Sequence, residues 1–280
     1  MKIDSHVHVT PPDIIADWKK YAEKEPYFSL ISNSKVNKFA TAEDVATVLD
    51  KDNFDKAVVF GFGFNDIGLC RYVNDYVIEK VKQFPEKLIG FAVAPPNCKE
   101  TRAEIERCCG AGLKGVGELF PQGQGIDLVN ENNVSSIAGT CKELDIPLLL
   151  HVNESVGHYY PGKTNVPLQN IEKFVLNNPG LKIILAHFGG GIFIYETMKE
   201  IKAGFRNVYY DTAVAPYLFD ARIYDVVKAL NICDRILFGS DFPILPPSRY
   251  FKSINASSLN GEEKDMILGL NTGKLLGILS

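Results

Sequence analysis

The feature that most constrains the fold is an alternation of short apolar runs with longer amphipathic segments along the chain. Each run is rich in Val, Ile, Leu or Phe and is bounded by Gly, Pro or polar residues. Continuous apolar runs of this length are typical of strands that are buried on both faces of a parallel sheet. The runs are Ile3–Val9, Lys56–Gly63, Leu88–Pro95, Leu113–Phe120, Ile146–Asn153, Leu181–Phe188, Asn207–Val214 and Arg235–Asp241. We therefore expect eight parallel strands.

The segments between the runs carry helical patterns. Thr41 and Asp44 resemble a capping box and precede a helical spacing of apolar residues that begins at Val45. Further helices are expected at Cys70–Phe84, Ala103–Cys109, Val134–Leu144, Leu168–Leu176, Ile192–Ile201 and Ala221–Leu230. Residues 10–40 are expected to form an irregular insertion after the first strand, and residues 248–279 to form appended C-terminal helices.

Eight strand–helix units in a chain of 280 residues favour a single α/β domain, residues 1–280, with the (β/α)₈ TIM-barrel fold. No low-complexity linker divides the chain. The alternative is an open doubly wound sheet, which needs a glycine-rich phosphate-binding turn after an early strand. The turn at Gly61-Phe-Gly63 lacks the third glycine of that motif, so the barrel is preferred.

The composition narrows the classes of partner. A net charge of −4 argues against binding to nucleic acid, which needs a surplus of Lys and Arg. No apolar run is long enough to span a membrane, and Asp4, His6 and His8 interrupt any N-terminal signal peptide. Six cysteines without a CxxC pair suit reduced thiols. We expect a cytoplasmic protein that acts on small molecules rather than on nucleic acid or membranes, and homo-oligomerisation is left open.

Polar residues at the ends of the predicted strands indicate where the chemistry lies, because barrels of this type build their active sites at the carboxyl ends of the strands. His6 and His8 end the first run. Residues i and i+2 of a strand point to the same face, so the two imidazoles can converge on one ion. The pattern favours a metal site over two unrelated histidines.

Three further residues lie at strand ends. His151 follows four apolar residues, where an unpaired polar group is costly, and we expect it to be a ligand rather than a core histidine. His187 is expected to be either a ligand of a second metal or an unligated acid or base. Asp241 can accept a proton from a metal-activated water and later deliver it, although a turn or helix cap before Pro243 is the alternative.

These residues carry a resemblance to a known family. Asp4-Ser-His6-Val-His8, His151, His187 and Gly239-Ser-Asp241-Phe-Pro243 are similar to the amidohydrolase superfamily. They resemble in particular its amidohydrolase 2, or amidohydrolase-related, branch, which includes aminocarboxymuconate-semialdehyde decarboxylase. The segment from Leu268 to Gly277 resembles the closing helix of that branch.

The resemblance implies a distorted (β/α)₈ barrel with one or two divalent metals, usually Zn²⁺. By this resemblance His6 and His8 would bind the first metal, and His151 would bind it or bridge toward a second. His187 would be a ligand or an acid/base, and Asp241 both a ligand and the general base.

The end of the fourth run is informative about the number of metals. Many hydrolases of the superfamily place a carboxylated Lys there, but Lys114 stands at the start of the run, too far from the rim. Glu118 has the right height and resembles the bridging Glu of the TatD-like deoxyribonuclease branch. It is either a bridging ligand, a residue that orients a histidine, or an exposed or capping Glu.

Three functions follow from this site. The first is a metal-dependent hydrolase that uses a metal-activated water on a small amide, lactone or ester, with Asp241 and His187 as catalytic residues. The second is a zinc-dependent, non-oxidative decarboxylase, in which His6, His8, His151 and Asp241 hold one metal and His187 handles a proton. The third is a ligand-binding barrel without turnover. Glu118 favours hydrolysis. Arg249 is a weaker candidate for binding an anion, and a surface role is expected for it instead.

Overall fold

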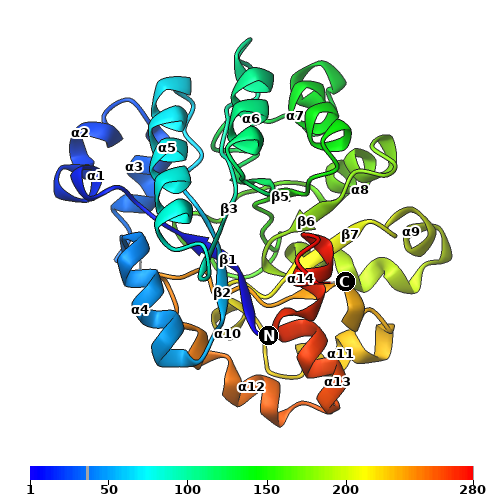
Figure 1. The fold of residues 1–280 in the computed structure, drawn as a ribbon. Coiled ribbons are helices and arrows are strands. Elements are labelled where there is room, and N and C mark those ends of the chain that lie inside the picture. Colours follow the sequence, from blue (N-terminus) through cyan, green and yellow to red (C-terminus); the bar gives the residue numbers. More distant parts are fainter. Residues whose placement is uncertain (36–37, 280) are drawn as a thin grey trace.

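The computed structural model describes residues 1–35 and 38–279 and places parallel strands at the centre of a ring of helices (Figure 1). Every one of the predicted apolar runs contains a strand. The strands are β1 Ile3–His8, β2 Lys56–Phe60, β3 Leu88–Gly90, β4 Val116–Leu119, β5 Leu148–Leu150, β6 Ile183–Leu185, β7 Val208–Asp211 and β8 Ile236–Leu237. The predicted strand pattern is therefore confirmed, although the strands are shorter than the runs.

The strands form two parallel sheets in chain order, β1-β2-β3 and β4-β5-β6-β7-β8. Isolated bridges connect the two sheets, Val7 with Phe242 on one side and Ala92 with Val116 on the other. The barrel is thus not closed by continuous strand ladders. Because the strands are parallel and follow one another around the ring, their carboxyl ends all open at the same end of the molecule.

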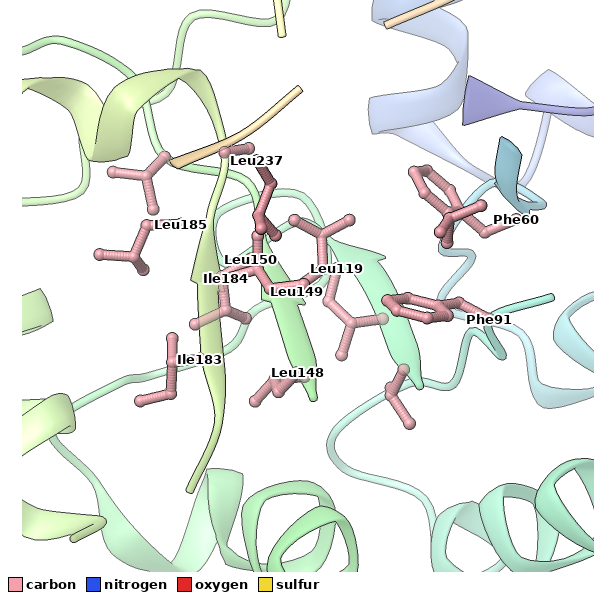
Figure 2. Close-up of a cluster of buried hydrophobic side chains, with 14 of the residues drawn as sticks. Phe60, Phe91, Leu119, Leu148, Leu149, Leu150, Ile183, Ile184, Leu185 and Leu237 are labelled. Atoms are coloured by element: carbon pink, nitrogen blue, oxygen red, sulfur yellow. The ribbon is translucent and has the colours of Figure 1, made fainter. Parts of the chain in front are cut away.

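Apolar side chains from several strands fill the interior (Figure 2). Leu119, Leu149 and Ile184 come from β4, β5 and β6 and are buried. Along β6, Ile184 lies on the opposite side of the strand from Ile183 and Leu185, as the two-residue period of a strand requires (Figure 2). Both faces of the strands are therefore covered, which explains the uninterrupted apolar runs.

The outer helices largely follow the prediction. They are α4 Ala42–Asp52, α5 Ile67–Gln83, α6 Thr101–Gly110, α7 Glu131–Glu143, α8 Leu168–Asn177 and α11 Ile223–Leu230. The capping box is confirmed, because the Thr41 N–H donates to Asp44 at 2.8 Å and the Asp44 N–H donates to the Thr41 hydroxyl. The helix expected at Ile192–Ile201 is wrong as one element. Extended backbone at Met198 separates the 3₁₀ segment η1, His187–Thr197, from α9, Lys199–Gly204.

The insertion after β1 is more regular than expected. It contains three short helices, α1 Pro12–Ala16, α2 Trp18–Ala22 and α3 Pro26–Ser32. Proline begins α1 and α3, where its fixed φ angle suits a helix and its missing N–H has no intrahelical partner. Helices of this length are too short to show a clear period in the sequence.

The C-terminal segment forms helices, as predicted. They are η3 Pro247–Arg249, α12 Phe251–Ala256, α13 Gly261–Asp265, η4 Met266–Leu270 and α14 Asn271–Leu275. The last of them pack beside β1 (Figure 1). A Cβ atom on Gly269 would lie 2.5 Å from the Met1 carbonyl oxygen, so this close contact requires glycine. The short elements α10 Ala215–Leu218 and η2 Cys233–Arg235 complete the fold.

Two further expectations can be compared with the structure. All six cysteines are free thiols. Within residues 1–35 and 38–279, no helix combines the length and the apolar character needed to cross a bilayer.

Candidate metal centre and pocket

The structure gathers all six predicted site residues at the carboxyl ends of the strands. They form two groups, His6 with His8 and Asp241, and Glu118 with His151 and His187. In each group the candidate ligand atoms lie within 4.8 Å of one another. The residues belong to strands or strand ends of β1, β4, β5, β6 and β8, so the barrel itself brings them together.

The first group leaves buried polar atoms without partners. The Nε2 atom of His6 lies 3.8 Å from Asp241 Oδ1, and the Nε2 atom of His8 lies 3.4 Å from the same oxygen. Both His6 Nε2 and Asp241 Oδ1 are buried and make no hydrogen bond. An unsatisfied buried polar atom costs about 1–3 kcal/mol. Nitrogen and carboxylate donors with this deficit fit a divalent cation.

In the second group, three atoms that can accept hydrogen bonds lie close together: Glu118 Oε1, His151 Nδ1 and His187 Nε2. His151 Nδ1 lies 2.9 Å from Glu118 Oε1, and His187 Nε2 lies 3.2 Å from His151 Nδ1. The other ring nitrogens donate to backbone carbonyls, His151 Nε2 to Gly162 and His187 Nδ1 to Ala213. In neutral rings the facing nitrogens therefore carry lone pairs. A proton or a cation must lie between them to relieve the repulsion.

Glu118 lies between the two groups. Its Oε1 faces His151, and its Oε2 lies 3.5 Å from His6 Nε2 and 3.3 Å from His8 Nε2. The side chain is buried. Lys114, in contrast, is exposed and precedes β4. The arrangement places a carboxylate, rather than a modified lysine, where it can contact both groups.

Burial and the neighbouring histidines shift the pKa values of the two carboxylates in opposite directions. Burial opposes a charge on Glu118, but His6 and His151 outweigh it and hold its pKa well below the usual range. Asp241 behaves similarly, since His6 and His8 overcome the effect of burial and lower its pKa. Both carboxylates are therefore ionised at neutral pH.

The same carboxylates act on the imidazoles. Burial alone would lower the pKa of His6, but Glu118, Asp211 and Asp241 raise it well above its usual value. Glu118 likewise raises the pKa of His151 against burial. Burial and the neighbouring His151 lower the pKa of His187. Positive charge is thus favoured in the space between these residues, whether protons or a cation supply it.

An unusual backbone run presents His187. Residues 187–191 all have positive φ angles, from 54° at Phe188 to 97° at Gly191. Gly189, Gly190 and Gly191 therefore do not open an ordinary helix. A Cβ on Gly190 would lie 2.3 Å from the carbonyl oxygen of Asn153, so glycine is needed for this close contact between the β5 and β6 loops.

A pocket of about 460 Å³ opens above the site. His8, Glu118, His151, His187 and Asp241 line it together with aromatic residues. Four of these aromatic residues are phenylalanines, Phe28, Phe39, Phe62 and Phe120, and the ring centroids of Phe62 and Phe120 lie 4.8 Å apart. The insertion after β1 therefore contributes to the pocket through Phe28 and Phe39.

The pocket has few charged groups besides the two clusters. Among the described residues that line it, Lys38 is the one Lys or Arg. Arg249 is exposed and does not line the pocket. The surface position expected for Arg249 is therefore confirmed, and Lys38 is better placed to bind an anion at this site.

Several contributing groups were not identified as such from the sequence. The carbonyls of Gly162 and Ala213 orient His151 and His187, and backbone atoms leave no signal of this kind in a sequence. Asp211 accepts a hydrogen bond from His6 Nδ1 at 2.8 Å and does not line the pocket. Its position at the end of β7, where the other site residues also end their strands, is the sequence signal that could have identified it.

Comparison with known proteins places the chain in a family. A curated relative from Dictyostelium discoideum, 2-amino-3-carboxymuconate-6-semialdehyde decarboxylase, is 24% identical over 99% of this chain and 92% of its own length. A solved structure of 5-carboxyvanillate decarboxylase from Novosphingobium aromaticivorans, complexed with manganese, has a TM-score of 0.75 at 16% identity, covering 99% of this chain and 96% of that one.

A third similar structure is 4-oxalomesaconate hydratase from Rhodopseudomonas palustris, with a TM-score of 0.72 at 20% identity, covering 99% of this chain and 96% of that one. These structural similarities support the TIM-barrel fold. The family model described as Amidohydrolase (Amidohydro_2) matches residues 3–278. The chain therefore belongs to the amidohydrolase 2 family of the amidohydrolase superfamily, as its strand-end motifs indicate.

Proposed function

We propose that the protein is a metal-dependent lyase that removes carbon dioxide, without oxidation, from a small carboxylic acid. The observation that carries this proposal is the similarity, over nearly the whole chain, to the 2-amino-3-carboxymuconate-6-semialdehyde decarboxylase. It replaces hydrolysis as the preferred hypothesis. The largely apolar pocket suits a compact organic acid whose carboxylate end reaches the histidine and carboxylate groups.

His6, His8 and Asp241 are the residues that would hold the catalytic cation, because their ligand atoms converge and two of them, His6 Nε2 and Asp241 Oδ1, have no hydrogen-bond partner. Imidazole and carboxylate donors together suit Zn²⁺, and we propose Zn²⁺ as the metal. When bound, the cation supplies positive charge that orients the substrate and stabilises the electron density that develops as carbon dioxide leaves. Lys38 is the pocket residue best placed to attract an acidic substrate.

The reaction also needs a proton. Loss of carbon dioxide leaves an electron pair on the substrate carbon, and a proton must replace the carboxylate there. We assign the transfer of this proton to His187, because its ring lines the pocket. His151 lies 3.2 Å from His187 Nε2 and can supply the proton to that nitrogen, since Glu118 raises the pKa of His151. Asp241 and Glu118 remain ionised and balance the positive charge.

Glu118 favours a second candidate function, hydrolysis of a small amide, lactone or ester. A carboxylate within reach of both groups is what an enzyme with two cations uses to hold them side by side. In that reaction Asp241 would accept a proton from the attacking water. The two functions use the same residues and differ in the bond that breaks.

Isotope labelling distinguishes the two reactions. Metal-reconstituted protein is incubated in H₂¹⁸O with a panel of ¹³C-carboxyl-labelled acids, lactones, esters and amides. Release of ¹³CO₂ without ¹⁸O in the organic product supports the lyase, and ¹⁸O incorporation supports the hydrolase. Turnover of nothing in the panel by metal-loaded protein contradicts both and favours a barrel that only binds its ligand. Metal-stripped protein is the control.

A further inference from the structure

We propose that Asp211 is a positioning residue that sets the tautomer of His6 and at the same time fixes the backbone of His187. A single carboxylate would then align one residue from each of the two groups. The inference rests on the proposed cation site, but it does not depend on which reaction the site catalyses.

Asp211 lies at the end of β7, fully buried, and receives donors on both oxygens. Its Oδ2 is 2.8 Å from His6 Nδ1. Its Oδ1 accepts the backbone N–H of His187 at 2.9 Å and that of Ala213 at 3.0 Å. Ala213 also accepts a hydrogen bond from His187 Nδ1 through its carbonyl. The segment 211–213 thus holds His187 at two points.

The contact with His6 determines which ring nitrogen carries the hydrogen. The carboxylate oxygens of Asp211 act as acceptors, so Nδ1 of the neutral His6 ring donates and Nε2 keeps its lone pair. That lone pair faces Asp241 and Glu118, where the cation is expected. The opposite tautomer would place a hydrogen in that space and remove His6 as a ligand.

Close packing keeps His6 and Asp211 together. A Cβ atom on Gly239 would lie 2.7 Å from the Cβ of His6 and 3.4 Å from that of Asp211. Gly239 in turn exchanges hydrogen bonds with Thr212, the neighbour of Asp211. The bare backbone at position 239 therefore allows the imidazole and the carboxylate to meet.

Asparagine at position 211 cannot reproduce these contacts. If its oxygen accepts the two backbone N–H groups, its NH₂ group faces His6 Nδ1 and imposes the tautomer with hydrogen on Nε2. In the reverse orientation its NH₂ group opposes two backbone donors. The first orientation satisfies more groups, so Asp211→Asn is expected to fold with His6 in the tautomer that does not bind metal. Asp211→Ala leaves space for water and imposes neither tautomer.

The test compares D211N and D211A with wild type, and with D52N as a control for loss of a buried carboxylate elsewhere. Circular dichroism checks folding. Zn²⁺ titration gives the affinity of the His6 site. The tautomer is read from ¹⁵N spectra of metal-stripped protein at an alkaline pH at which the His6 ring is neutral, with the His6 signals assigned from a His6→Gln variant. We expect D211N to lose about 10–100-fold in affinity, the usual effect of removing a residue that orients a ligand, and to place the hydrogen on Nε2. D211A should lose less, and D52N should match wild type.

The order of the variants separates positioning from simple packing. A structural role predicts the reverse order, because alanine leaves a larger void than asparagine. Equal or greater loss in D211A, or a wild-type tautomer in D211N, would overturn the proposal. If D211N does not fold, D211A alone decides the question: a wild-type Zn²⁺ affinity and a wild-type His6 tautomer in D211A would also overturn the proposal. If wild-type protein itself binds no Zn²⁺ at His6, the proposed cation site fails instead.

Discussion

His151 Nδ1 and His187 Nε2 face each other at 3.2 Å, while the opposite nitrogen of each ring donates to a backbone carbonyl. Two neutral imidazoles held in this way would direct lone pairs at each other. The contact is stable only with positive charge between the rings. The amidohydrolase fold therefore prepares a site for a proton or a cation before any substrate arrives.

Cation binding should release protons. Neighbouring carboxylates raise the pKa values of His6, His8 and His151 against the effect of burial, so these rings bind protons more tightly in the metal-free protein than free imidazoles do. A cation must displace these protons, so its apparent affinity should rise as the pH rises from 6 to 8. Calorimetry in buffers of different ionisation enthalpy measures the number of protons released. Binding at pH 7 without proton release would contradict the assignment.

Glu118→Gln should weaken binding at both groups. The amide is neutral and has a single acceptor oxygen, so it cannot face His151 and the His6–His8 pair with negative charge at the same time. We expect a loss of at least about tenfold in the affinity for Zn²⁺, comparable to removal of a residue that supports a metal site. Glu154→Gln, which alters a partly buried carboxylate in the β5–α8 loop, is the control. Equal Zn²⁺ affinities in E118Q and E154Q would show that Glu118 does not contribute.

Asp4→Asn should change how stability depends on pH. Burial raises the pKa of Asp4 to about 7, with Ser240 as its main hydrogen-bond donor. At Asp4 the folded protein therefore binds a proton more tightly than the unfolded chain does. The stabilisation that this proton gives to the folded state is fully present below about pH 4 and is lost as the pH rises to 7. The stability of the variant relative to wild type should increase over that range, by at most about 1.4 kcal/mol per pH unit.

Urea denaturation of chelator-treated protein at several pH values tests this expectation for Asp4. D52N, a change at another buried carboxylate, serves as the control. A stability difference between D4N and wild type that stays constant from pH 4 to pH 7 would rule out the raised pKa.

Gly190 and Gly191 form a matched pair for testing the left-handed run. Both have positive φ angles, so alanine at either position costs about 1–2 kcal/mol in backbone strain. Only at Gly190 would the added Cβ also meet a close atom, the Asn153 oxygen at 2.3 Å, whereas nothing lies within 4 Å of a Cβ added at Gly191. Urea denaturation should therefore show a larger loss of stability in G190A than in G191A. Equal losses would mean that the β5–β6 contact is not tight.

Most of the fold and the location of the site could be predicted from the strand pattern in the sequence. His6 and His8 could be predicted to share a face because a strand has a two-residue period, and the strand-end rule brought in His151, His187 and Asp241. The strand-end rule predicts where the backbone of each residue lies, but it does not predict the direction in which each imidazole ring points.

The separation into two groups depends on contacts that are distant in sequence. The carbonyl of Gly162 turns His151 toward Glu118 and away from Asp241, and Asp211 meets His6 across 205 positions of chain. A sequence alone does not show which carbonyl faces which imidazole. The left-handed run after β6 was missed for a related reason, since His187 and Phe188 rarely adopt positive φ angles.

The most direct test of the metal centre is a crystal structure of protein soaked with Zn²⁺, with data collected to record anomalous scattering from zinc. We expect an anomalous peak in contact with Nε2 of His6, Nε2 of His8 and a carboxylate oxygen of Asp241. At saturating Zn²⁺, the absence of density among these three side chains, or a peak only elsewhere on the molecule, would contradict the proposed site.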